Sequence, residues 1–212
     1  NKYFIAEKAI VASEIYPVKL TIARDAFKDS WKLGNRDIKF IMKWINFEDN
    51  HDQATTKGIE ICENYLDEEK VSPIHKIQVR RKLTIFLNKK AINLSDSAPE
   101  QSIKLFQESA YLNIINYYSS KENLEQERSM SRPSYNITDL KEKASKSIIS
   151  FANACLKNSY PSLFLSLLNK IQFSEKRPFD HFANTIITQC ISLFKNLEHC
   201  IIDELTETRR QA

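Results

Sequence analysis

The stretch SPIHKIQVRRKLTIFLNKKAINLSDSAPEQSIKLFQESAYLNIINY, residues 72–117, carries two signals for the start of a helix and contains no glycine. Ser72 precedes Pro73, which places a capping serine before a proline at the first helical position, so we predict a helix from Pro73 to about Leu94. The segment Ser97-Ala98-Pro99-Glu100 repeats the proline signal and adds a Ser-x-x-Glu capping box. The stretch therefore predicts two long helices in succession.

Glycine is scarce in the rest of the chain as well. Gly34 and Gly58 are the only two glycines among 212 residues, where average usage would give about fifteen. Parallel α/β folds need glycine in phosphate-binding loops and tight turns, and sandwiches and barrels need it in hairpins. We therefore predict an all-α fold: an irregular multi-helix bundle or a short α-solenoid of about seven to nine helices, with a long C-terminal helix from Pro178 to about Thr206.

Apolar residues at helical spacing predict the other helices, and a turn is expected at Gly34. The expected helices cover approximately residues 4–15, 20–31, 38–48, 138–155 and 161–171, and a further helix has its apolar face over residues 59–66. Asp52 is expected to cap the helix with the 59–66 face, and Thr138 is expected to cap the helix over residues 138–155. Residues 119–136 are polar and charged, which predicts a mobile polar loop, following a frayed helical extension. We expect a single helical domain over residues 1–212. Because the chain opens at Asn1 without Met or a leader, it is expected to be a fragment of a longer protein or a processed product.

The composition limits the classes of partner. The chain has 31 Lys and Arg against 27 Asp and Glu, a net charge of +4 and a pI near 8.8, and a dedicated nucleic-acid-binding domain is expected above pI 9. Nucleic acid is therefore not an expected partner. No apolar run approaches the roughly 18 residues of a membrane-spanning helix. The four cysteines are far apart and form no Cys-x-x-Cys pair, which favours reduced core thiols of an intracellular protein over disulfides or metal ligands.

No catalytic signature is present in the sequence. It contains no G-x-S-x-G, no G-x-x-x-x-G-K and no kinase-like set. The possible metal ligands His181, Cys190, His199 and Cys200 are expected on one helix. His181 and His199 would lie about 27 Å apart there, and ligands on a single helix must be three or four residues apart. We expect no metal and no cofactor. We favour a binding function over an enzyme, although a helical enzyme can assemble its site from distant side chains.

The sharpest polar pattern is an acidic helix, residues 59–69, followed by a basic helix within residues 71–95. The favoured interpretation is that the two faces neutralise each other across a short hairpin. The alternative is that bases of the second helix face outward and bind phosphate, more readily that of membrane lipids than of nucleic acid, because no aromatic-basic stacking motif appears. This candidate basic surface consists of Lys76, Arg80, Arg81, Lys89 and Lys90.

A second candidate surface combines aromatic and basic residues: Trp31, Lys32 and Arg36. Tryptophan among basic residues is typical of binding hot spots and of membrane interfaces. Packing of the tryptophans in the core is the favoured alternative, and Trp44 fits the core beside Ile41 and Ile45.

The expected function is that of a helical protein–protein interaction module, a scaffold or adaptor whose partner is another protein. One alternative is a membrane-surface or phosphoinositide-binding module of an effector that acts on intracellular trafficking. Another is a cofactor-free regulator such as a small-GTPase exchange factor, which needs only a surface that stabilises its nucleotide-free partner. The expected location is intracellular, either cytoplasmic or peripheral at a membrane. Enrichment in Lys, Asn, Ser and Ile is typical of an AT-rich genome, as in many intracellular bacteria and protozoa, which makes delivery into a host cell part of the effector alternative.

Overall fold

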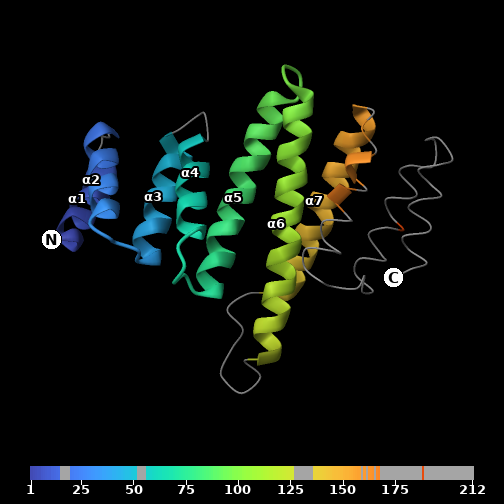
Figure 1. Ribbon diagram of the computed structural model, residues 1–212. Coiled ribbons are helices and arrows are strands. Elements are labelled where there is room, and N and C mark those ends of the chain that lie inside the picture. Colours follow the sequence, from blue (N-terminus) through green and yellow to red (C-terminus); the bar gives the residue numbers. More distant parts are fainter. Residues whose placement is uncertain are drawn as a thin grey trace. The chain divides into compact units, whose positions relative to one another are not determined.

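The computed structural model describes residues 1–14, 20–51, 56–126 and 136–158, together with residues 160, 162–164, 166–167 and 188. All regular structure in these residues is helical, and the helices pack against one another as in a bundle (Figure 1), which confirms the all-α class. The chain divides into two compact units, Asn1–Phe86 and Leu87–Ala212. We describe each unit by itself, and a single domain over residues 1–212 stays a prediction.

Seven helices have defined bounds in the described residues. They are α1 (Lys2–Glu14), α2 (Leu20–Lys32), α3 (Ile38–His51), α4 (Thr56–Leu66), α5 (Pro73–Leu94), α6 (Pro99–Gln126) and α7 (Ile137–Lys157). The predicted helix over residues 161–171 is described only in part. The predicted long C-terminal helix lies outside the described residues, apart from Thr188. None of the helices in the described ranges combines the length and the apolar character that crossing a bilayer requires.

Of the predicted helix caps, Asp52 lies outside the described residues, and one of the other three is confirmed in full. The Ser72 hydroxyl accepts the His75 N–H at 3.3 Å, and α5 begins at Pro73. Helix α6 begins at Pro99 as predicted, but the Ser102 N–H donates to the Ala98 carbonyl at 3.0 Å, which makes Ala98 the N-cap. The predicted capping box, with Ser97 as its N-cap, is therefore wrong, because the N-cap lies one residue later.

The start of α7 also differs from the prediction. Asn136, not Thr138, is the N-cap, because its side-chain oxygen accepts the Thr138 N–H at 3.0 Å. Both residue types are good caps. The choice is settled by the extended backbone of Asn136, with φ −73° and ψ 106°, which directs its side chain at the first turn.

The first part of the predicted mobile loop is helical. Helix α6 runs to Gln126, so residues 119–126 continue it, as the predicted helical extension anticipated. Extending an existing helix gains one backbone hydrogen bond per added residue, and Lys, Glu, Leu and Gln are good helix formers. Residues 127–135 lie outside the described part of the chain.

The first unit has an aromatic core between α2 and α3. The Phe27 ring lies parallel to Trp44, with ring centroids 5.8 Å apart, and tilted against Phe40 and Phe47 at 5.6 and 5.5 Å. Helix α1 lies beside α2 (Figure 1), and the Ser30 hydroxyl donates to the Lys2 carbonyl at 3.0 Å. These contacts hold α2 in place on both of its sides.

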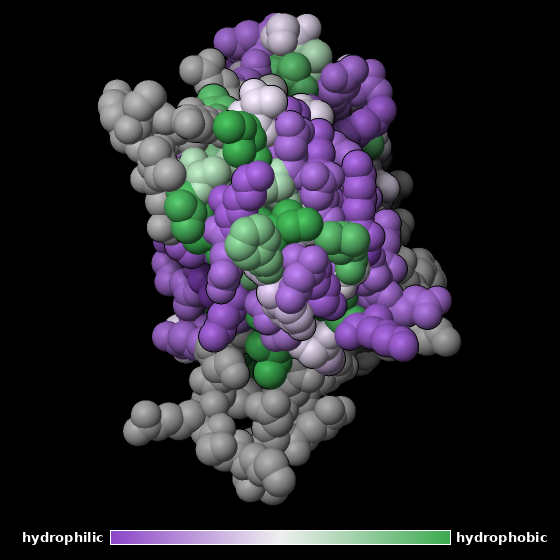
Figure 2. Space-filling model, turned by 90° about the vertical axis from the view of Figure 1, so that its left-hand side faces the viewer, coloured by the Kyte–Doolittle hydropathy of each residue, from purple (hydrophilic) through white to green (hydrophobic). Residues whose placement is uncertain are grey.

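Helix α1 buries its small residues and exposes its large ones. Ala6, Ala9 and Ala12 are buried, whereas Phe4 and Val11 are 68% and 56% exposed. Figure 2 looks onto this end of the structure and shows apolar residues among hydrophilic ones. Phe4 and Val11 are seven residues apart and therefore share a helical face.

In the second unit, α6 and α7 pack around an apolar cluster that also includes Phe164 and Leu167. The Phe151 and Phe164 rings lie 6.0 Å apart. A row of small polar residues is buried on α6, and the Ser102 hydroxyl donates to the Ala91 carbonyl at 2.7 Å. The members of the row are Ser102, Ser109, Asn113, Asn116 and Ser120.

Candidate functional site

A cavity of about 230 Å³ opens in the first unit among α2, α3 and α4. Trp31 of α2 and Trp44 of α3 line it, with ring centroids 6.4 Å apart and planes inclined by 59°. The remaining lining residues are Lys28, Lys32, Glu48, Lys57, Glu60, Ile61 and Asn64. The cavity thus has aromatic walls and a charged rim.

Helical periodicity explains how these side chains meet. On α2, Lys28, Trp31 and Lys32 are spaced i, i+3 and i+4, so they share one face. On α4, the lining residues from Lys57 to Asn64 follow the spacing i, i+3, i+4 and i+7. Each helix therefore contributes a continuous stripe of side chains to the cavity.

The turn after α2 positions Arg36 beside Trp31. Gly34 has φ +80°, and the Gly34 N–H donates to the Trp31 carbonyl at 2.8 Å while the Asn35 N–H donates to the Ser30 carbonyl at 3.1 Å. This pair of bonds is the Schellman motif, which ends the helix with a left-handed residue. The predicted turn at Gly34 is confirmed, and it reverses the chain immediately before Arg36.

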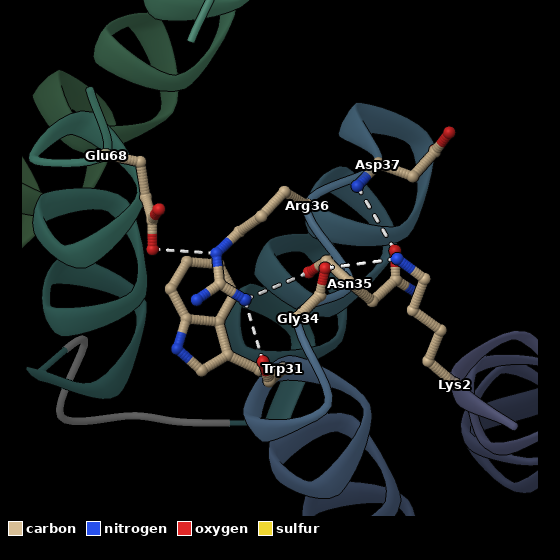
Figure 3. A network of polar contacts seen from close by, with 7 residues as sticks. All are labelled: Lys2, Trp31, Gly34, Asn35, Arg36, Asp37 and Glu68. Carbon is tan, nitrogen blue, oxygen red and sulfur yellow. Dashed lines mark hydrogen bonds and ion pairs between the residues drawn. The ribbon is translucent and has the colours of Figure 1, made fainter. Parts of the chain in front are cut away.

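Arg36 joins α2 to the turn that follows α4. Its guanidinium carbon lies 3.4 Å from the centroid of the Trp31 ring, and its Nη1 donates to the Trp31 carbonyl at 2.7 Å. Its Nε donates to the Glu68 carboxylate at 2.7 Å. Figure 3 shows the guanidinium between the indole of Trp31 and Glu68. A planar guanidinium suits both stacking on an indole and pairing with a carboxylate.

A second, more open cavity adjoins the first. It is lined by Arg36, Asp67, Glu69 and Lys70, with Glu68, and it shares Asn64 with the tryptophan-lined cavity. The two together form what we call the α2–α4 groove. It extends along α4 from Lys57 to the turn after Leu66.

One buried ion pair lies beneath the groove. Arg24 of α2 donates three hydrogen bonds of 2.8–3.1 Å to both oxygens of Glu48 on α3. The Glu48 side chain is 2% exposed. Because a buried carboxylate is stable as an anion only when paired, Arg24 offsets the charge of Glu48 at the cavity wall.

Burial raises the pKa of two titratable groups of α4. Burial raises the pKa of the Cys62 thiol far above its ordinary value, with Glu63 adding to the effect. Burial, followed by the charges of Asp37 and Glu68, raises the pKa of Tyr65. Both groups are therefore neutral near pH 7, and a neutral buried thiol is a poor nucleophile.

The described residues offer little for catalysis by a metal or a thiol. No group of three or more His, Cys, Asp or Glu side chains gathers there as metal ligands would. Cys62 and Cys155 are free and buried. The residues weighed for metal binding in the sequence, His181, Cys190, His199 and Cys200, lie outside the described residues. The groove provides instead an aromatic surface flanked by fixed charges.

The structure brings the predicted aromatic-basic residues together. Trp31 and Lys32 line the tryptophan-lined cavity, and Arg36 lines the adjoining one. Trp44, expected in the core, is 7% exposed and packs on Phe27, yet it also lines the cavity.

The predicted basic residues of α5 differ in exposure. Lys89 is exposed, whereas Lys76, Arg80, Arg81 and Lys90 are half-buried. Lys89 and Lys90 fall in the second unit and the other three in the first. The described ion pairs of the first unit include Arg36–Glu68 and Lys82–Asp49, and neither of these connects α4 with α5. Neutralisation across the α4–α5 hairpin stays a prediction.

Sequence reasoning missed the α4 wall of the groove. Lys57, Ile61 and Asn64 were not singled out, and neither was the Arg24–Glu48 pair. The i, i+3, i+4, i+7 spacing on α4 was a usable signal for the wall. No sequence signal marked the Arg24–Glu48 pair, because its two residues are 24 positions apart in the sequence.

No protein-family model, no characterised protein and no solved structure matches this chain.

Proposed function

We propose that the protein is a helical protein–protein interaction module whose α2–α4 groove binds a segment of another protein. The observation that carries this proposal is the cavity of about 230 Å³ between Trp31 and Trp44. Pockets for drug-sized ligands are usually about 300–1,000 Å³. The smaller cavity suits one apolar side chain, and tryptophan-lined pockets with a polar rim are typical of interface hot spots.

An anionic membrane surface has less support as the partner. Of the five predicted basic residues on α5, only Lys89 is exposed, and the other four are half-buried. A polybasic segment needs several exposed bases, since each contributes only about 1 kcal/mol at an anionic membrane. Action in intracellular trafficking and nucleotide exchange on a small GTPase stay predictions from the sequence.

The experiment is selection of a displayed random-peptide library on the folded protein. Trp31 and Trp44 are the only tryptophans in the chain, so intrinsic fluorescence reports directly on the cavity. We expect selected peptides without tryptophan to shift the emission and to show saturable binding.

Asn64→Phe tests the location, because Asn64 is exposed on α4 and lines both cavities. Phenylalanine there should fill the groove and weaken peptide binding at least tenfold. Asn46→Phe is the matched control, since Asn46 is exposed on α3 and does not line either cavity. Peptides that bind Asn64→Phe as well as they bind the parent protein, or that leave the emission unchanged, would refute the groove as the binding site.

A further inference from the structure

The α2–α4 groove has a direction along which its charge changes. Lys28 in α2 and Arg36 in the turn that follows it mark the two ends of the groove on one side, and Lys57 in α4 and Glu68 in the turn after Leu66 mark the same two ends on the other. Lys28 and Lys57 line the tryptophan-lined cavity, whereas Arg36 and Glu68 line the second cavity and are joined to each other at 2.7 Å. The two helices therefore run in the same sense along the groove.

The tryptophan-lined end carries an excess of positive charge. Three lysines line it, Lys28, Lys32 and Lys57, against the carboxylates of Glu48 and Glu60. Arg24 offsets Glu48 through the buried pair described above. Lys32 also lies 3.8 Å from Asp29, but both side chains are more than half exposed, so this contact leaves most of the charge available to a ligand.

The opposite end carries an excess of negative charge. Asp67, Glu68 and Glu69 line it together with Arg36 and Lys70. Arg36 is paired with Glu68, which leaves Asp67 and Glu69 against Lys70. Asp67 and Glu69 are both exposed.

We infer that the α2–α4 groove selects a peptide segment with an acidic residue at one end, an apolar residue in the middle and a basic residue at the other. The inference rests on the proposed function and specifies the chemistry of the partner. The acidic end of the segment meets Lys28 and Lys32, the apolar side chain enters the cavity between the tryptophans, and the basic end meets Asp67 and Glu69. The eleven residue steps from Lys57 in α4 to Glu68 in the turn after it correspond to about 16 Å at helical spacing, which an extended peptide covers with about five residues.

The acidic end of the groove favours a peptide over a membrane or nucleic acid. Phosphate groups repeat along those partners with a single sign of charge. A partner of uniform negative charge that satisfies the lysines would place further negative charge beside Asp67 and Glu69. A peptide can carry both signs within the length of the groove.

The test uses synthetic seven-residue peptides with a central leucine and three kinds of flanks. The mixed peptide is Asp-Asp-Ser-Leu-Ser-Lys-Lys, and the others have aspartate on both flanks or lysine on both flanks. Binding is followed by tryptophan fluorescence at about 50 mM salt, where surface charges are only weakly screened. We expect the mixed peptide to bind at least fivefold more tightly than either of the others.

The second part of the test reverses charges on the protein instead of on the peptide. In the double variant Lys28→Glu/Lys32→Glu the groove becomes acidic at both ends, so preference should pass to the peptide with lysine on both flanks. Lys39→Glu is the control, because Lys39 is exposed in the first turn of α3, where an added carboxylate is tolerated. It should leave the preference for the mixed peptide unchanged.

The outcomes separate this inference from the proposed function. Equal affinities for all three peptides, with binding still lost in Asn64→Phe, would overturn the charge selectivity and leave the groove as a binding site. Groove-dependent binding of library peptides without any binding of the mixed peptide would also overturn it. Failure of both the mixed peptide and the random library would refute the proposed function together with the inference.

Discussion

Gly34 and Gly58 lack a side chain for different physical reasons. Gly34 needs its left-handed φ of +80° to end α2, and the space around it is open. Gly58 lies inside α4, where an added Cβ would stand 2.5 Å from the tip of the Phe86 ring. Phe86 is only 1% exposed, so its ring has little room to move away.

We expect both glycine-to-alanine variants to be destabilised, for these separate reasons. Gly34→Ala should lower the free energy of unfolding by about 1–2 kcal/mol, the cost of a left-handed non-glycine residue. Gly58→Ala combines an overpacking cost of about 1–3 kcal/mol with a gain in helix propensity of about 1 kcal/mol. Urea unfolding measures both changes.

The variant Phe86→Leu distinguishes the two mechanisms in a double-mutant cycle. It should relieve much of the cost of Gly58→Ala, because the clash is with the Phe86 ring. The destabilisation caused by Gly34→Ala should simply add to that of Phe86→Leu, because a Cβ added at Gly34 meets no atom within 4 Å beyond its chain neighbours. A Gly58→Ala protein that is more stable than the parent would contradict the overpacking argument.

The Arg24–Glu48 pair supports the groove from below. Arg24→Ala should destabilise the first unit by about 3 kcal/mol or more, because it leaves a buried carboxylate without its partner. Arg24→Met/Glu48→Leu should cost much less, since it removes both buried charges. Urea unfolding of the single and the double variant measures both changes in the free energy of unfolding. Equal stabilities of the two variants would show that the unpaired Glu48 carboxylate does not cause the destabilisation of Arg24→Ala.

At the scale of helices, the sequence predicted where elements exist better than how they begin. The helix at Pro73 and the helix at Pro99 were both identified, since a proline at the first helical position is a local signal. The cap of α6 was misplaced because Pro99 occupies the first helical position and makes its neighbour Ala98, a poor capping type, the N-cap in place of Ser97. The cap of α7 was misplaced because two good capping residues, Asn136 and Thr138, stand close together and the backbone angles choose between them. The end of α6 at Gln126 was beyond local prediction, since polar residues are compatible with both helix and loop.

Helix α4 should make the protein sensitive to alkaline pH. The pKa of the buried Cys62 thiol is raised in the folded state from an ordinary value of 9.0. Above that pH the unfolded chain releases the thiol proton and the folded protein retains it, so stability falls as pH rises, by up to about 1.4 kcal/mol per pH unit. Tyr65 acts in the same direction at higher pH, because its pKa is also raised.

Cys62→Ala isolates this effect. We expect urea unfolding between pH 9 and 11 to show a shallower loss of stability in the variant than in the parent, whatever the stabilities of the two proteins at pH 7. All other titrating groups contribute equally to both profiles. Parallel profiles across this range would show that Cys62 titrates alike in the folded and unfolded states.

At the scale of the molecule, the scarcity of glycine was enough to predict the all-α class, but the groove required the tertiary structure. Its residues come from three helices and two turns between Lys28 and Lys70. The sequence marked Trp31, Lys32 and Arg36, because basic residues surround the tryptophans. It favoured the core for Trp44, since amphipathic spacing does not distinguish a core tryptophan from one that also lines a cavity.

The balance of charges over the whole chain leads to a final prediction about membranes. The chain has 31 basic against 27 acidic residues, and Lys89 is the one exposed member of the candidate basic surface. We therefore expect no saturable binding to vesicles with or without phosphoinositides. Cosedimentation at about 50 and 200 mM salt measures this, because screening weakens charge-driven contacts. The variant Lys89→Glu/Lys90→Glu should then behave as the parent does. Lipid-selective binding that the higher salt and this variant both abolish would contradict the expectation and make α5 a membrane-binding surface, since about 1 kcal/mol per exposed base is lost with each reversed charge.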